Sequence, residues 1–175
     1  LRDMVDFECK NDRVAMGILS SIYMLEQGYS IESACEKSLQ GKQEFVSWAN
    51  DNHALYESYV AMAVRSRSKF GRGISSKAFG TVFYIAERIY GDGFASRFCD
   101  CINGDSVGAY RFREVFYRMF NQKQGKARVA SSYQAGTLLI GARRYHERGE
   151  LPQKTSYNKQ LENLSYFNRA LEGMM

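Results

Sequence analysis

Apolar side chains recur at spacings of three and four residues along most of this chain, and no stretch of any length alternates between apolar and polar residues. The first spacing places side chains on one face of an α-helix, whereas alternation is typical of a half-buried strand. The single proline, Pro152, leaves the rest of the chain free to form helices. The sequence therefore predicts an all-α fold, which we expect to be one domain over residues 1–175, an irregular bundle of about eight or nine helices.

Glycine and capping residues divide this pattern into segments. Ser30 and Ser75 precede apolar-periodic stretches, as N-caps do, and Gly28 follows one, as a C-terminal glycine does. The cluster Asn50-Asp51-Asn52 predicts a break between two helices. The helical stretches that we predict are 2–10, 13–27, 31–39, 42–49, 53–68, 77–90, 94–102, 107–121, 126–147 and 156–171. The middle of the stretch 126–147, Gly136–Ala142, is almost entirely apolar or small, so we expect it to be buried on most sides.

The four cysteines do not form a recognisable framework. Cys9 and Cys35 stand alone in helical stretches, and Cys99 and Cys101 form a Cys-Asp-Cys sequence. Disulfide scaffolds are typical of smaller, loop-rich chains, and a zinc ribbon needs two spaced C-x-x-C pairs that this chain lacks. We therefore expect free, mostly buried thiols in a reducing compartment, with no metal site and no cofactor.

Sequence motifs for catalysis are also missing. The glycines around Arg72 lack the Lys-Ser/Thr of a phosphate-binding P-loop, and neither an H-E-x-x-H nor a G-x-S-x-G motif occurs. His53 and His146 fall at helix ends, where a capping or surface role accounts for them, and Glu147 and Glu150 lie where we expect solvent. We predict no catalytic residue, although the sequence leaves open whether the chain has any catalytic activity.

Charge is distributed unevenly. Residues 1–64 hold five Lys/Arg against ten Asp/Glu, a net charge of −5, and residues 65–175 hold nineteen against nine, a net charge of +10. The cations are densest in Arg65–Lys77, which has no acid, and in Arg111–Arg128, where Glu114 alone opposes them. The candidate nucleic-acid-binding residues are Arg65, Arg67, Lys69, Arg72, Lys77, Arg111, Arg113, Arg118, Lys123, Lys126 and Arg128.

Such segments favour a phosphate-rich partner, because each lysine or arginine contact with a phosphate releases condensed counterions. Aromatic residues alternate with arginines in Tyr110-Arg111-Phe112-Arg113, and Tyr117 and Tyr133 follow nearby; exposed rings beside cations can stack unpaired bases. Other interpretations of these aromatic residues and charges remain possible alternatives. Phe112 and Phe116 also have core spacing, and a run of charge can simply be a solvated surface or contact an acidic protein.

One part of the chain resembles a known protein region. The motifs Phe94-Ala-Ser-Arg-Phe, Asn103-Gly104, Tyr110-Arg-Phe-Arg-Glu-Val-Phe-Tyr-Arg and Leu138-Leu-Ile-Gly-Ala-Arg-Arg-Tyr-His-Glu-Arg-Gly are similar to the helical region that follows the ParB/sulfiredoxin-like domain of many phage and prophage proteins. Where that region reads Ala-Trp-Asn, this chain has Gly141–Tyr145. The ParB-like core itself is not in these residues, so none of its catalytic residues carries over. The resemblance implies a phage-type, DNA-associated helical protein.

We therefore expect a non-enzymatic, helical nucleic-acid-binding domain of phage or mobile-element origin, with DNA as the expected partner. The alternative is a protein–protein interaction or self-association module, such as an inhibitor of a host factor, that uses the acidic N-terminal third or an exposed apolar patch. No apolar run approaches the roughly 18–20 residues of a membrane helix, so we expect no membrane association. The expected location is the cytoplasm, that of the host if the chain is phage-encoded. A first residue other than Met leaves open whether an N-terminal domain precedes this segment.

Overall fold

The structure is a computed structural model and describes residues 12–39, 41–71, 73–120 and 130–174. Within these ranges the chain forms nine α-helices and one 3-10 helix, and no strand. The prediction of an all-α, irregular single-domain bundle is confirmed. The predicted helix over 2–10 lies outside the described residues.

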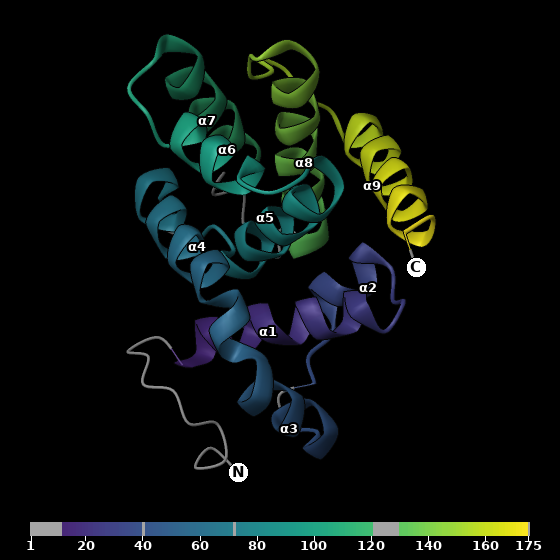
Figure 1. The fold of residues 1–175 in the computed structure, drawn as a ribbon. Coiled ribbons are helices and arrows are strands. Elements are labelled where there is room, and N and C mark those ends of the chain that lie inside the picture. Colours follow the sequence, from purple (N-terminus) through teal and green to yellow (C-terminus); the bar gives the residue numbers. More distant parts are fainter. Residues whose placement is uncertain (1–11, 40, 72, 121–129, 175) are drawn as a thin grey trace.

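The helices follow one another with short connections (Figure 1). Their bounds are α1 Asp12–Glu26, α2 Ile31–Glu36, α3 Gln43–Asn52, η2 (the 3-10 helix) His53–Tyr56, α4 Glu57–Phe70, α5 Ser76–Tyr90, α6 Phe94–Ile102, α7 Val107–Phe120, α8 Ser131–Arg148 and α9 Tyr157–Glu172. Ser30, Ser75 and Ser156 cap α2, α5 and α9, each accepting a hydrogen bond from the amide three residues later, at 3.1–3.2 Å.

Helix α5 is the centre of the bundle. It contacts α1, α2, α4, α6, α8 and α9, and every residue from Ala78 to Ala86 is buried. The sequence pattern places Phe79, Val82, Phe83 and Ala86 on one face, but the helix is enclosed on its other side as well. There Gly80 and Thr81 are small enough for α1 to approach, and the Thr81 hydroxyl lies 2.6 Å from that of Ser21.

Helices α3 and α7 lie at opposite ends of the molecule (Figure 1). Helix α3 lies at the lower end in Figure 1, whereas α7 lies at the upper end, next to α6. Helix α8 packs against both α5 and α9. Its segment Gly136–Ala142 is buried as predicted, except for Ile140, which is half-buried. The loop 149–154, which follows α8, therefore comes close to the start of α7, and this proximity builds the site described below.

Several helix boundaries differ from the prediction. Helix α2 ends at Glu36, three residues before its predicted end at residue 39. The cluster Asn50-Asp51-Asn52 does not break the chain before residue 50, because α3 continues to Asn52, whose side-chain amide donates to the Trp48 carbonyl at 2.8 Å. The change of direction comes in η2, where one helix was predicted over 53–68. The start predicted at Lys126 lies outside the described residues, and α8 is described from Ser131.

Among the described cysteines, Cys35 and Cys99 are buried thiols and Cys101 is half-buried; none of the three is in a disulfide. Burial raises the pKa of Cys35 to about 12 and also raises the pKa of Cys99 and Cys101. No helix in the described ranges is both long enough and apolar enough to span a bilayer.

The contact between α5 and α1 gives a stability prediction. A Cβ atom on Gly80 would lie 2.7 Å from Cγ1 and Cγ2 of Ile18, a fully buried and branched side chain. We expect Gly80→Ala to lower the free energy of unfolding by about 1–3 kcal/mol, as overpacked cores do, although alanine is the better helix former. The matched control is Gly108→Ala on α7, where the nearest atom is the Ser106 Oγ at 4.0 Å. That change should be neutral or stabilise by up to about 1 kcal/mol. Denaturant unfolding measures both, and an equal effect of the two would contradict the proposed packing.

Candidate nucleic-acid interface

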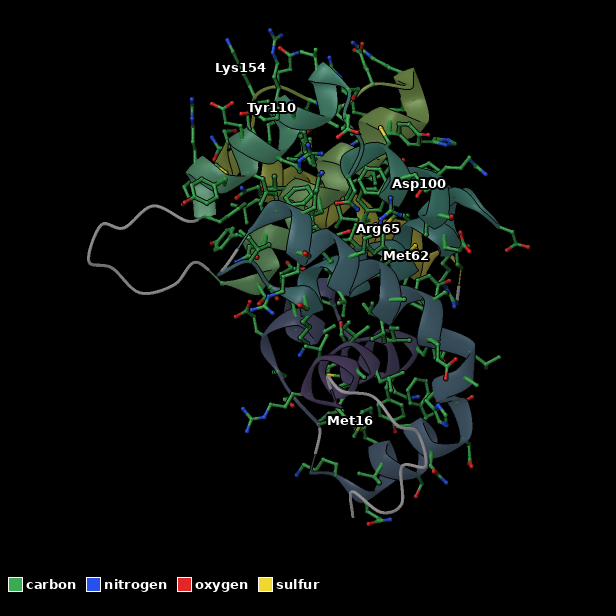
Figure 2. The ribbon with its side chains drawn as sticks, turned by 90° about the vertical axis from the view of Figure 1, so that its left-hand side faces the viewer. Met16, Met62, Arg65, Asp100, Tyr110 and Lys154 are labelled. Atoms are coloured by element: carbon green, nitrogen blue, oxygen red, sulfur yellow. The ribbon has the colours of Figure 1, made fainter. Side chains whose placement is uncertain are left out.

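The first basic segment, Arg65–Lys77, contains cations that pair with nearby acids. Arg65 on α4 lies 2.6 Å from the Asp100 carboxylate on α6, a pair visible in Figure 2. The Lys69 ammonium lies 3.9 Å from the carboxylate of Asp105. All four side chains remain substantially exposed, so these ion pairs add little stability. They do place a negative charge beside each cation, which weakens the attraction of this segment for phosphate.

Other cations of this segment bind the protein's own backbone. The Arg67 Nε donates to the Ile74 carbonyl at 3.2 Å, and the Lys77 Nζ donates to the Lys37 carbonyl at 2.5 Å. Burial lowers the pKa of Lys77, because a low-polarity environment disfavours its charged form. Arg67 thereby stabilises the connection between α4 and α5, and Lys77 links α5 to the segment that follows α2. Arg72, the remaining candidate here, lies outside the described residues.

In the second basic segment, Arg111–Arg128, two of the described arginines are held by contacts within the protein, whereas a third is exposed to solvent. Arg113 donates to the carbonyls of Ile102 and Gly104 at 2.7 and 2.8 Å, where α6 ends. Arg118 is paired with Glu114 one helical turn away. Arg111 is exposed, and its terminal nitrogen donates to the amide oxygen of Gln153 at 3.5 Å; no acid among the described residues forms an ion pair with it. The candidates Lys123, Lys126 and Arg128 lie outside the described residues.

The aromatic residues of α7 divide between the core and the solvent. Phe112 and Phe116 are buried, with at most 1% of their surface exposed, which confirms the core reading of their spacing. Tyr110 and Tyr117, in contrast, are 64% and 49% exposed. They are seven residues apart, so both lie on one face of the helix, about 10 Å from each other along its axis. Tyr133 is not part of this face: it lies on α8, edge-on to Tyr157 of α9.

A groove opens beside the start of α7, and we call it the α7 groove. It has a volume of about 620 Å³ and is lined by Ser106, which precedes α7, Gly108 of its first turn, Arg144 of α8 and the loop 149–154. Leu151 and Pro152, both buried, form an apolar wall, and Lys154 contributes a second cation. Figure 2 shows Lys154 and Tyr110 at the same end of the molecule. The groove and the exposed face of α7 are therefore neighbours.

Arg144 is the most unusual side chain of the α7 groove. Its terminal nitrogen lies 3.3 Å from the Glu150 carboxylate, a long contact for an ion pair. Its Nε is buried and has no hydrogen-bond partner, although buried polar atoms are nearly always satisfied. The guanidinium thus keeps donor capacity that the protein itself does not use.

Sequence reasoning missed Arg144 and Lys154. Arg144 lies in the run Arg143-Arg144-Tyr145-His146-Glu147-Arg148, which the charge analysis did not single out, and Lys154 stands alone ten residues later. The available signal was the Gly149–Pro152 turn after a helix, which brings a following lysine back toward that helix. A second groove, of about 660 Å³, lies between α1 and α3, but it pairs one cation, Lys42, with one acid, Glu44. Of these two grooves, the α7 groove has the larger number of cations, Arg144 and Lys154 with one acid, Glu150, and it lies beside the exposed rings of α7.

Three kinds of side chain that often take part in catalysis can be placed within the described residues. No group of three His, Cys, Asp or Glu side chains within them could hold a metal ion. His146 stacks on the Tyr90 ring with centroids 4.0 Å apart, as a surface packing residue does. The raised pKa of Cys101, which lines the α7 groove, keeps its thiol protonated near neutral pH and therefore a poor nucleophile.

Comparisons of the chain with protein-family models, with curated proteins and with solved structures found no match. The resemblance to the helical region of phage ParB-like proteins therefore stays a prediction from the sequence.

The two arginines at the start of α7 should differ in their effect on stability. We expect Arg113→Gln to lower the free energy of unfolding by about 1–3 kcal/mol, because two carbonyls lose a charged donor. Arg111→Gln should change it by less than about 0.5 kcal/mol, as exposed substitutions do. Both variants lose one positive charge, so each controls for the other in thermal and denaturant unfolding. Equal destabilisation by the two would show that Arg113 has no special structural role.

Proposed function

We propose that this protein binds single-stranded nucleic acid across the exposed face of α7 and the adjoining α7 groove. The observation that carries the proposal is the pair of solvent-exposed rings, Tyr110 and Tyr117, on one helix face beside Arg111, which is exposed and forms no ion pair with the described residues. Rings and cations together are what sequence-tolerant single-strand binding requires.

Each part of the proposed surface would contact a different part of the strand. A tyrosine ring offers a flat apolar face to any base, and the two rings are far enough apart to stack separate bases. Arg111, Arg144 and Lys154 surround the same end of the helix and would contact phosphates. In a duplex the bases are already stacked on each other, so their faces are inaccessible to the rings. A single strand therefore fits this surface better.

The proposal differs from the sequence expectation in its choice of cations. Arg65 and Lys69 have acidic partners, and Arg67, Lys77 and Arg113 hold backbone carbonyls, so we assign them at most a peripheral role. The proposed function includes both DNA and RNA as ligands, because base stacking and phosphate contact are common to the two. No reaction is proposed.

A second candidate function is a protein-interaction module at the opposite end of the molecule. Leu55 of η2 is 69% exposed, and the exposed acids Asp51 and Glu57 lie close to it in the chain. An apolar side chain among acids suits a basic protein partner. This candidate predicts capture of a positively charged protein that Leu55→Glu abolishes and that added oligonucleotide leaves unchanged.

The proposed function is tested by fluorescence anisotropy with a labelled oligothymidylate, an oligouridylate and a duplex of the same length. We expect both single strands to bind better than the duplex, with affinity falling steeply as salt rises. Tyr110→Ala should weaken binding about tenfold or more, since stacking one base is worth about 1–3 kcal/mol. The matched control is Tyr29→Ala, which removes another exposed tyrosine, between α1 and α2.

Arg111→Ala tests the phosphate contact separately. We expect it to reduce the slope of log affinity against log salt by about 0.7, the value for one phosphate contact on a single strand. Arg13→Ala, which removes an exposed arginine on α1, should leave the slope unchanged. Failure of the wild-type chain to bind any single strand at low salt would refute the proposed function.

A further inference from the structure

We infer that the α7 groove is a phosphate subsite, in which Arg144 and Lys154 hold one phosphate group of the bound strand while Tyr110 stacks a neighbouring base. The inference rests on the proposed function and adds to it the part of the ligand that this groove takes. It rests on the groove itself, on cations that come from two separate elements, and on an unsatisfied buried donor.

The size and lining of the groove fit part of a nucleotide. Its volume of about 620 Å³ lies within the range of small-molecule sites in proteins. The wall formed by Leu151 and Pro152 can pack against a sugar, while Arg144 and Lys154 provide charge on the polar side. Gly108 has no side chain to fill the space beside the first turn of α7, and a Cβ there would meet only the Ser106 hydroxyl at 4.0 Å. A phosphate can therefore approach the backbone closely.

The unused hydrogen-bonding capacity of Arg144 points to an anion. Its Nε is buried without a partner, and its terminal nitrogen makes only the 3.3 Å contact with Glu150. A guanidinium presents Nε and a terminal nitrogen as a fork, and that fork matches two oxygens of a phosphate. The Nε is covered in this conformation, whereas the side chain as a whole is 42% exposed, so a phosphate in the groove would first contact the terminal nitrogens. Drawing the side chain away from Glu150 would then bring the Nε to the same phosphate.

Glu150 acts as a competitor in this arrangement. Its carboxylate lines the groove and faces the same guanidinium that we assign to the phosphate. Removing its charge should therefore strengthen binding. An improvement of this kind is informative, because a substitution that merely damages the fold does not increase affinity.

The experiment measures the affinity of the full chain for labelled oligothymidylate. We expect Arg144→Gln and Lys154→Gln each to weaken binding about tenfold and to reduce the salt slope by about 0.7, as loss of one phosphate contact does. Glu150→Gln should tighten binding several-fold. The matched control is Arg148→Gln, which removes an exposed arginine one turn further along α8 that does not line the groove.

Cys101 provides a second readout, because it lines the groove and is half-buried. Its raised pKa makes alkylation slow at neutral pH, so the reaction is run with excess reagent at alkaline pH, where more of the thiol is deprotonated. The modified cysteine is then located by mass spectrometry. Thymidine 5′-monophosphate should protect Cys101 from alkylation, whereas thymidine should not. Inorganic phosphate at the same concentration should protect less, because it lacks the sugar that packs on the apolar wall.

Three outcomes separate the two proposals. If wild-type chain binds the strand but the Arg144, Lys154 and Glu150 variants behave like the Arg148 variant, the phosphate subsite is wrong and the proposed function stands. If thymidine and thymidine 5′-monophosphate protect Cys101 from alkylation equally well, the groove does not recognise phosphate, and the inference fails. If wild-type chain binds no single strand, the proposed function fails and the inference fails with it.

Discussion

The close approach of α1 to α5 is the contact on which the rest of this structure depends. A helix that is buried along nine consecutive residues needs neighbours on every side, and Gly80 and Thr81 leave the space that Ile18 and Ser21 of α1 fill. With α5 enclosed in this way, its other sides are left for α4, α6, α8 and α9. The position of α8, and of the loop that follows it, is thus a consequence of how α5 is packed.

The candidate site depends on that packing through α7 and α8. Gly141 of α8 lies against Phe112, since a Cβ at Gly141 would be 2.8 Å from the Phe112 ring. This contact fixes the buried side of α7, and its opposite side then carries Tyr110 and Tyr117. Whether an arginine or lysine can bind a phosphate depends on its immediate surroundings, because a nearby acid or carbonyl oxygen already occupies its donors. For this reason the number of arginines in a segment is a poor guide to what that segment can bind.

The sequence was sufficient for the fold class and for several details. Helical spacing identified most helices, and Ser30 and Ser75 were recognisable as caps because short-range chemistry determines them. The burial of every residue from Ala78 to Ala86 of α5 was not predictable from the pattern, because Gly80 and Thr81 are informative only once the opposing helix is known. Among the site residues, Arg111 was identified from its segment, whereas the pairing of Arg65 with Asp100 and the convergence of Arg144 and Lys154 on one groove arise from tertiary contacts.

The central claim, that a single strand lies along α7, is tested most directly by photocrosslinking. A bromodeoxyuridine-substituted single strand would be irradiated with the full chain, and the attached residues identified by mass spectrometry. The account predicts crosslinks to Tyr110 and Tyr117, the exposed rings of α7. Crosslinks found instead at Tyr29, the exposed ring between α1 and α2, or none at all under conditions where the strand is bound, would contradict it.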